Sequence, residues 1–132
     1  METVKIIIEK TEDLFSAYAE NVEGIYAGGE TVAEVKKSVD DAIRLLKENN
    51  SEENIPEILK GDYQIVYQFD TASLLSYYKG VFTNSAFEKL TGINQKQIQH
   101  YASGHRKPSI ETTHKIESAL HKLGEELLSV EL

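Results

Sequence analysis

Residues 92–109 read GINQKQIQHYASGHRKPS, and this stretch decides the fold of the second half of the chain. Gly92 suits the left-handed backbone conformation that ends one helix, and Asn94 is placed to cap the next helix. The segment that follows is expected to bury Ile98 and Tyr101, which are three positions apart, and to stop before a basic loop. The sequence therefore predicts two short helices joined by a tight glycine turn.

The opposite side of the second short helix is rich in amides and almost free of carboxylates. The residues expected to point outward are Gln95, Lys96, Gln97, Gln99 and His100. Glutamine can pair with adenine, and lysine with guanine or phosphate, so this face suits the edges of DNA bases. The alternative is a polar surface helix that happens to carry glutamines. A matching frame on both sides of the helix favours the DNA-binding interpretation.

The frame consists of two further predicted helices. Residues 84–91 (NSAFEKLT) predict a short helix with Phe87 and Leu90 facing inward, and residues 110–123 predict a longer amphipathic helix with Ser109 as its N-cap. The order is helix, glycine turn, polar helix, G-x-R-K-P-S loop and amphipathic helix. This order resembles the Xre (lambda-repressor-like) family of helix-turn-helix DNA-binding proteins over roughly sixty residues.

The resemblance implies a DNA-binding head whose contacts fall into two classes. Contacts to bases are expected from Gln95, Lys96, Gln97, Gln99 and His100, and contacts to phosphates from Asn84, Lys89, Arg106 and Lys107. Two positions depart from the family pattern, since Glu88 stands where a small residue is usual and Ala102 replaces a glutamate that contacts arginine. One such head grips few phosphates, so a homodimer or higher homo-oligomer on operator DNA is expected.

The net charge of −8 is unevenly divided along the chain. Residues 1–70 carry 16 Asp and Glu against 7 Lys and Arg, whereas residues 71–132 carry 6 against 7 and all four histidines. Acidic domains repel phosphate, so we expect the first half to bind something other than DNA. A basic protein is the natural partner for this half, and acidity that serves only solubility is the alternative.

The first half predicts a small sheet with one helix packed on a single face. The expected elements are a hairpin of Thr3–Lys10 and Leu14–Asn21, a short third strand within Gly24–Gly29, a helix from Val32 to about Lys47, and a strand at Tyr63–Phe69. Thr31 and Glu34 form a capping box at the start of the helix. The fold class is therefore α+β, with an αβ domain at residues 1–70 and an all-α domain at residues 71–132.

The hairpin, the glycine-bearing segment and the run GGETVAEV at Gly28–Val35 resemble the N-terminal domain of the HicB antitoxin family. This resemblance implies a partial ribonuclease-H-like fold that binds a small basic ribonuclease toxin (HicA-like) and covers its active site. It also implies a prokaryotic, cytoplasmic antitoxin whose C-terminal helix-turn-helix represses the shared operon. Val22–Ile25 is all that remains of the family's usual turn before the helix. The candidates for toxin contact are Gly24–Gly29 and the acidic edge.

We do not expect an enzyme, a cofactor or a metal site. A ribonuclease-H-like enzyme needs several carboxylates converging on metal ions, but Glu9 and Glu20 have no evident third partner. His114 and His121 lie seven positions apart on one predicted helix, where a solvent-exposed pair is expected. The chain has no cysteine, and no Gly-Lys-Ser/Thr run follows its glycines.

Two points stay open at this level. The main alternative function is a stand-alone transcriptional regulator whose first domain senses a ligand or dimerises, and an adaptor with a relic helix-turn-helix is a third. The tail at residues 124–132 is either a short strand or an extension of the preceding helix. The beginning of the chain has neither a signal-like nor a membrane-spanning pattern, so a cytoplasmic location is expected.

Overall fold

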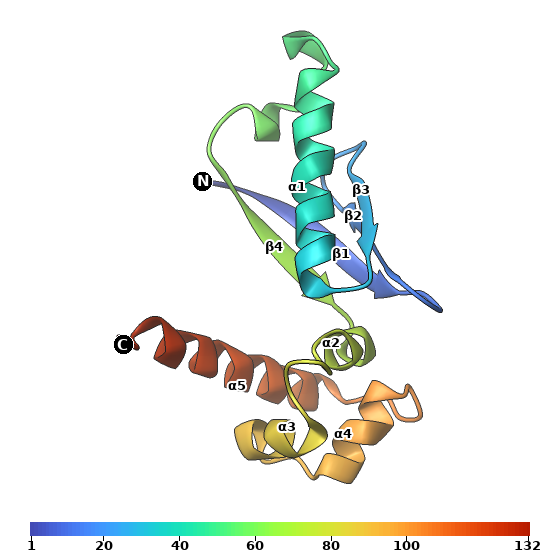
Figure 1. The fold of residues 1–132 in the computed structure, drawn as a ribbon, viewed down its shortest axis with the longest axis vertical. Coiled ribbons are helices and arrows are strands. Elements are labelled where there is room, and N and C mark those ends of the chain that lie inside the picture. The colour runs from blue at the N-terminus through green and yellow to red at the C-terminus, as the bar shows by residue number, and fades with distance from the viewer. The chain divides into compact units, whose positions relative to one another are not determined.

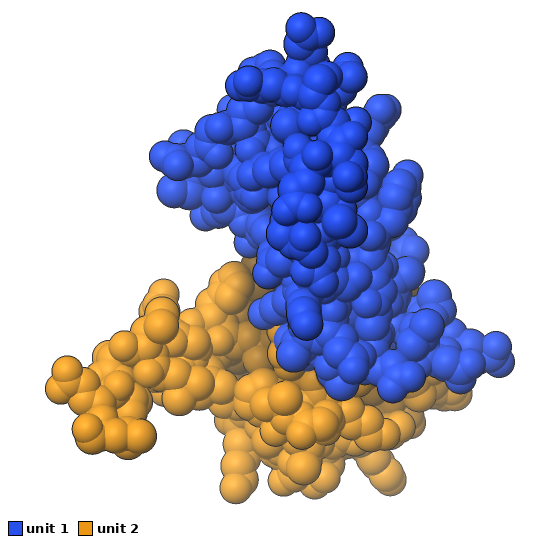
Figure 2. Space-filling model, turned by 45° about the horizontal axis from the view of Figure 1, so that its top comes forward, with its two compact units in different colours: residues 1–73 blue, residues 74–132 orange.

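The computed structural model describes all residues, 1–132, and divides into two compact units, residues 1–73 and residues 74–132 (Figures 1 and 2). The protein is α+β, with a four-stranded mixed sheet and five α-helices. The division falls inside α2 (Thr71–Tyr77), a helix that the sequence pattern did not predict. None of the helices combines the length and the apolar composition needed to cross a membrane.

Unit 1 contains the whole sheet. Its elements are β1 (Glu2–Lys10), β2 (Phe15–Ala19), β3 (Tyr26–Gly29), α1 (Val32–Glu48), two 3₁₀ turns η1 (Glu52–Asn54) and η2 (Glu57–Leu59), and β4 (Tyr63–Phe69). The strand order is β3-β2-β1-β4. The predicted hairpin is confirmed by the antiparallel pairing of β1 with β2, and β4 joins the other side of β1 in parallel. A parallel neighbour needs a crossover, and α1 lies within that crossover.

The core of unit 1 lies between α1 and one face of the sheet (Figure 1). The fully buried aliphatic residues of this layer include Val4, Ile6 and Ile8 from β1 and Val35, Val39 and Ile43 from α1. The β1 residues alternate with half-buried ones, and the α1 residues recur every fourth position, as the strand and helix periods require. The other face of the sheet remains open to solvent.

The predicted cap at the start of α1 is confirmed by the Thr31 hydroxyl, which accepts a hydrogen bond from the Glu34 amide at 3.1 Å. The Glu34 carboxylate reaches back to the entry of the helix, where it accepts from the amide of Glu30 at 2.8 Å. The two bonds tie the end of β3 to the first turn of α1.

Unit 2 contains α3 (Asn84–Thr91), α4 (Gln95–Ala102) and α5 (Ile110–Leu128). Its core is a cluster of buried residues from α2, α3 and α4, namely Leu75, Phe87, Ile98 and Tyr101. Leu120 from α5 packs against the same cluster. Burial raises the pKa of Tyr78, whose ring also packs against it. The predicted bounds of α3 are confirmed, and Leu90 is half-buried.

Most of the tail at residues 124–132 continues the last helix, α5. The Ser109 hydroxyl caps α5 by accepting from the Thr112 amide at 3.1 Å, as predicted, and the helix runs to Leu128, not to residue 123. No strand forms at residues 124–132. Leu127 is 61% exposed and Leu128 is 90% exposed, so the last turn of α5 presents apolar side chains to solvent.

Gly29 is required where β3 meets α1. A Cβ at this position would lie 2.7 Å from Glu34 Cβ and 2.9 Å from the backbone nitrogen of Val35. Because helix backbone yields little, we expect Gly29→Ala to lower the free energy of unfolding of unit 1 by about 1–3 kcal/mol. Gly61→Ala is the matched control, since nothing lies within 4 Å of its added Cβ. Urea unfolding followed by the amide NMR signals of β1 tests this prediction, and equal midpoints would contradict it.

Candidate nucleic-acid interface

The turn between α3 and α4 is built as the sequence predicted. Gly92 has a φ of 77°, in the left-handed region, and its amide donates to the Glu88 carbonyl at 2.8 Å. The Asn94 side chain accepts from the Lys96 amide at 2.8 Å and caps α4. These two features end one helix and begin the next within three residues. The direction of α4 is therefore fixed relative to α3.

Thr91 reinforces the turn from inside. Its buried hydroxyl donates to the Phe87 carbonyl at 2.6 Å and accepts from the Ile93 amide at 3.1 Å. A buried backbone amide without a partner is costly, so this hydroxyl satisfies a group that the glycine turn would otherwise leave unpaired.

Glu88 has a role that its place in the sequence did not reveal. Its carboxylate accepts a hydrogen bond from the Gln95 amide at 2.6 Å, which places a negative charge at the N-terminus of α4. A carboxylate in this position satisfies a free helix amide and interacts favourably with the helix dipole. It also occupies the first amide of α4, so that amide is not available to a phosphate.

Three of the five residues predicted on the outward face of α4 are exposed, and the other two are partly buried. Ile98 is fully buried, and the exposed residues on the other side are Gln95, Lys96 and Gln99. Gln97 and His100 are half-buried. Each directly precedes a buried residue, Ile98 or Tyr101, and so lies about 100° of helix rotation from it, at the border of the apolar stripe.

His100 holds the loop that follows α4. Its carbonyl accepts from the Arg106 amide at 3.1 Å and from the Ser103 hydroxyl at 3.2 Å. Its ring lies 5.0 Å from the ring of His105, centroid to centroid, and its Nδ1 is buried without a hydrogen-bond partner. His100 therefore positions the basic loop and offers only part of its ring to a ligand.

Gln99 is joined to the start of α3. The Asn84 side-chain amide donates to Oε1 of Gln99 at 2.8 Å. Both side chains keep unused capacity, because the Gln99 NH₂ remains a donor and Asn84 Oδ1 remains an acceptor. The pair thus presents a fixed donor and acceptor, a combination that can meet the edge of a base.

The cations of unit 2 are unpaired. The four ion pairs of the protein all lie in unit 1, so none of the seven Lys and Arg residues of unit 2 is neutralised by a carboxylate. Lys89, Arg106 and Lys107 are exposed. Free, exposed cations can take phosphates without first breaking an internal ion pair.

Lys115 is a further cation of this region that the sequence pattern did not single out. Its Nζ lies 4.0 Å from where a Cβ on Gly92 would stand, so α5 brings it to the turn between α3 and α4. In the sequence it belongs to the polar side of an amphipathic helix. Only the packing of α5 against α3 gives it this place.

The protein has no cluster of side chains suited to bind a metal ion. No group of three or more His, Asp or Glu side chains is placed to hold a metal ion. Glu20 forms an ion pair with Lys5 at 3.4 Å, and Glu9, His114 and His121 are exposed.

No protein-family model matches the chain, and no curated protein or solved structure is significantly similar to it. Function must be inferred from the chemistry of its surfaces.

The buried hydroxyl of Thr91 should stabilise the turn between α3 and α4 by a measurable amount. Thr91→Val keeps the shape but leaves the Ile93 amide without a partner, so we expect unit 2 to lose about 1–3 kcal/mol of stability. Hydrogen exchange of the Ile93 amide should become faster in Thr91→Val and stay slow in Thr91→Ser, which retains the hydroxyl. Equal protection in both variants would show that the hydroxyl does not order the turn.

Proposed function

We propose that the chain is a DNA-binding repressor and the antitoxin of a HicA/HicB-type toxin–antitoxin pair. Unit 2 acts as an Xre-type helix-turn-helix head that binds operator DNA, and unit 1 acts as a HicB-like domain that occludes a small basic ribonuclease toxin. The observation that carries the proposal is the face of α4, where Gln95, Lys96 and Gln99 are exposed on a capped helix in a unit whose cations are all unpaired.

The residues of unit 2 divide by chemistry into two groups. Gln95, Lys96 and Gln99 can reach base edges, because amides recognise adenine and lysine recognises guanine. Lys89, Arg106, Lys107 and Lys115 take phosphates, which fix the register of the protein on the duplex. Asn84 holds Gln99 in place through its 2.8 Å hydrogen bond and contributes to positioning. Gln97 and His100 are half-buried, so only the exposed part of each side chain can contact DNA.

The antitoxin half of the proposal is supported by the order of elements and by charge. Unit 1 has a hairpin, a third strand, one helix and a parallel fourth strand, consistent with the partial ribonuclease-H-like fold that the HicB resemblance implies. Its 16 acidic against 7 basic residues make it unsuited to nucleic acid and suited to a basic protein.

Self-association is supported by the end of α5. Apolar residues recur on this helix with the spacing of a coiled-coil seam, at Ile116, Leu120, Leu123 and Leu127. The first of these is buried within unit 2, whereas Leu127 is 61% exposed. We infer that the exposed end of this stripe joins two copies, so that two heads bind two half-sites of DNA.

The stand-alone regulator remains the competing proposal, and the gene neighbourhood distinguishes the two. We expect a short adjacent reading frame encoding a basic protein of well under a hundred residues. Its product should cleave RNA and arrest growth when expressed alone, and co-expression with the full chain should restore growth and yield a complex that purifies intact. Absence of such a gene, or a product that the full chain neither binds nor inhibits, would favour the stand-alone regulator.

Gln95 should behave as a base contact. We expect Gln95→Ala to weaken binding to the preferred operator by about 1–3 kcal/mol and to leave binding to random DNA almost unchanged. Gln68→Ala, which removes an exposed amide from unit 1, is the matched control and should change neither affinity. Fluorescence anisotropy with both DNAs measures the difference. Equal losses on the two DNAs would assign Gln95 to the phosphate contacts.

Arg106 and Lys107 should behave as phosphate contacts. Their replacement by alanine should weaken binding to all sequences alike and reduce the slope of log affinity against log salt by about one for each charge removed. Lys37→Ala, which removes an exposed, unpaired cation from α1, should leave that slope unchanged. A slope in Arg106→Ala identical to that of the parent chain would remove this residue from the interface.

A further inference from the structure

The open face of the sheet carries a row of apolar side chains across its strands. The strand register places Ile7 beside Tyr18, and Tyr18 beside Tyr26. These residues alternate with the buried ones beneath α1, so they lie on the opposite face. Tyr18 is 37% exposed, Tyr26 is 76% exposed, and Val66 on β4 adds a further apolar residue at 44%. Neither tyrosine hydroxyl has a hydrogen-bond partner within the chain.

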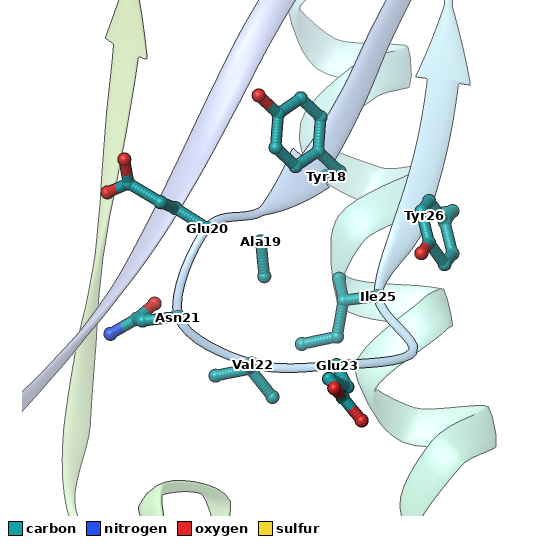
Figure 3. Close-up of a pocket in the computed structure, with 8 residues that line it drawn as sticks. All are labelled: Tyr18, Ala19, Glu20, Asn21, Val22, Glu23, Ile25 and Tyr26. Carbon is teal, nitrogen blue, oxygen red and sulfur yellow. The ribbon is translucent and has the colours of Figure 1, made fainter.

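A hollow of about 320 Å³ lies at one end of this row, between the end of β2 and the start of β3. Figure 3 shows Tyr18 and Tyr26 on the two neighbouring strands and the connecting loop curving around the space. The carboxylate-bearing residues of its lining are Glu20 and Glu23, and no cation lines it. The hollow thus combines two aromatic rings with two acids.

The loop around the hollow is held firmly in place. The Asn21 side chain accepts from the Lys5 amide at 3.0 Å and donates to the Thr3 carbonyl at 2.8 Å. Val22 and Ile25 from the same loop are buried, at 6% and 1% exposure. A loop anchored on both sides does not have to be ordered when a partner binds, which favours affinity.

The charge of unit 1 is strongly one-sided outside α1. Outside α1, residues 1–70 carry 12 acidic residues against 3 basic ones. Of those three, Lys5 is paired with Glu20 at 3.4 Å and Lys60 with Glu57 at 2.9 Å. The third, Lys10 at the end of β1, is exposed and forms no ion pair. The four remaining cations of unit 1 belong to α1, on the other side of the sheet, where Lys36 lies 5.3 Å from the centre of the Tyr67 ring.

We propose that the open face is the docking surface for a basic protein, which inserts an arginine or lysine side chain into the hollow between Tyr18 and Tyr26. This inference rests on the proposed antitoxin function and names the surface that performs it. A cation in the hollow gains from the aromatic faces and from the carboxylate of Glu23, while that of Glu20 is held by Lys5 at 3.4 Å. Tyrosine and arginine are also the residues that most often dominate the energy of protein interfaces.

Charge favours this occupant over a second copy of the chain. Two copies meeting through this face would bring two strongly acidic surfaces together, and like charges placed opposite each other oppose association. A basic partner gains from the same field at long range, and its binding weakens as salt screens the charges.

The test uses the full chain and the purified product of the adjacent short basic reading frame. We expect Tyr26→Ala and Glu23→Gln each to weaken binding by about tenfold or more. Leu45→Ala, which shortens an exposed side chain on α1, and Glu53→Gln, which removes an exposed charge elsewhere in unit 1, are the matched controls and should bind like the parent. Tyr26 is exposed enough that its loss should leave the fold intact, which circular dichroism verifies.

The possible results distinguish an error in the proposed docking surface from an error in the proposed antitoxin function. If the parent chain binds the basic protein and both hollow variants bind it equally well, the docking surface is wrong while the proposed function stands. If the parent chain does not bind it at all, the proposed function fails and the inference fails with it. Sedimentation in which Tyr26→Ala dissociates the free protein would make the face a self-association surface and would also overturn the proposal.

Discussion

The hydrogen bond from the Gln95 amide to the Glu88 carboxylate, 2.6 Å long, is the contact on which the candidate DNA-binding face depends. Helix α4 has only eight residues, and helices shorter than about 12–15 residues are marginal in isolation. It persists because its N-terminus is capped by Glu88 and Asn94 and because Ile98 is fully buried. The exposed amides can therefore be presented in one orientation, which sequence-specific contact requires.

Unit 1 follows a different constraint, since its sheet has only one helix to cover it. One face is buried against α1, and the other remains open with Tyr18 and Tyr26 exposed. Exposed aromatic residues on a strongly acidic surface favour a protein partner over nucleic acid. The two units thus carry surfaces of opposite chemistry, and this contrast supports a protein that links partner binding to DNA binding.

Features that depend on residues close together in the sequence could be predicted, whereas contacts between residues far apart in the sequence could not. Caps, turns and apolar periodicity predicted the hairpin, β4, α1 and α3 with bounds close to those observed. The same rules missed α2, and they did not predict the parallel pairing of β1 with β4. They also did not separate the half-buried Gln97 and His100 from the exposed residues of α4, and they missed Lys115, because helix rotation against a core and the packing of α5 depend on tertiary structure.

The most direct measurement is an NMR titration of the isotope-labelled full chain with a DNA duplex from upstream of its own gene. We expect the signals of Gln95, Lys96, Gln99 and the loop at residues 104–107 to shift and those of β1–β4 to stay unchanged. A scrambled duplex should give smaller shifts at the three α4 residues. No shifts in α4, or shifts confined to unit 1, would contradict the assignment of this face to DNA.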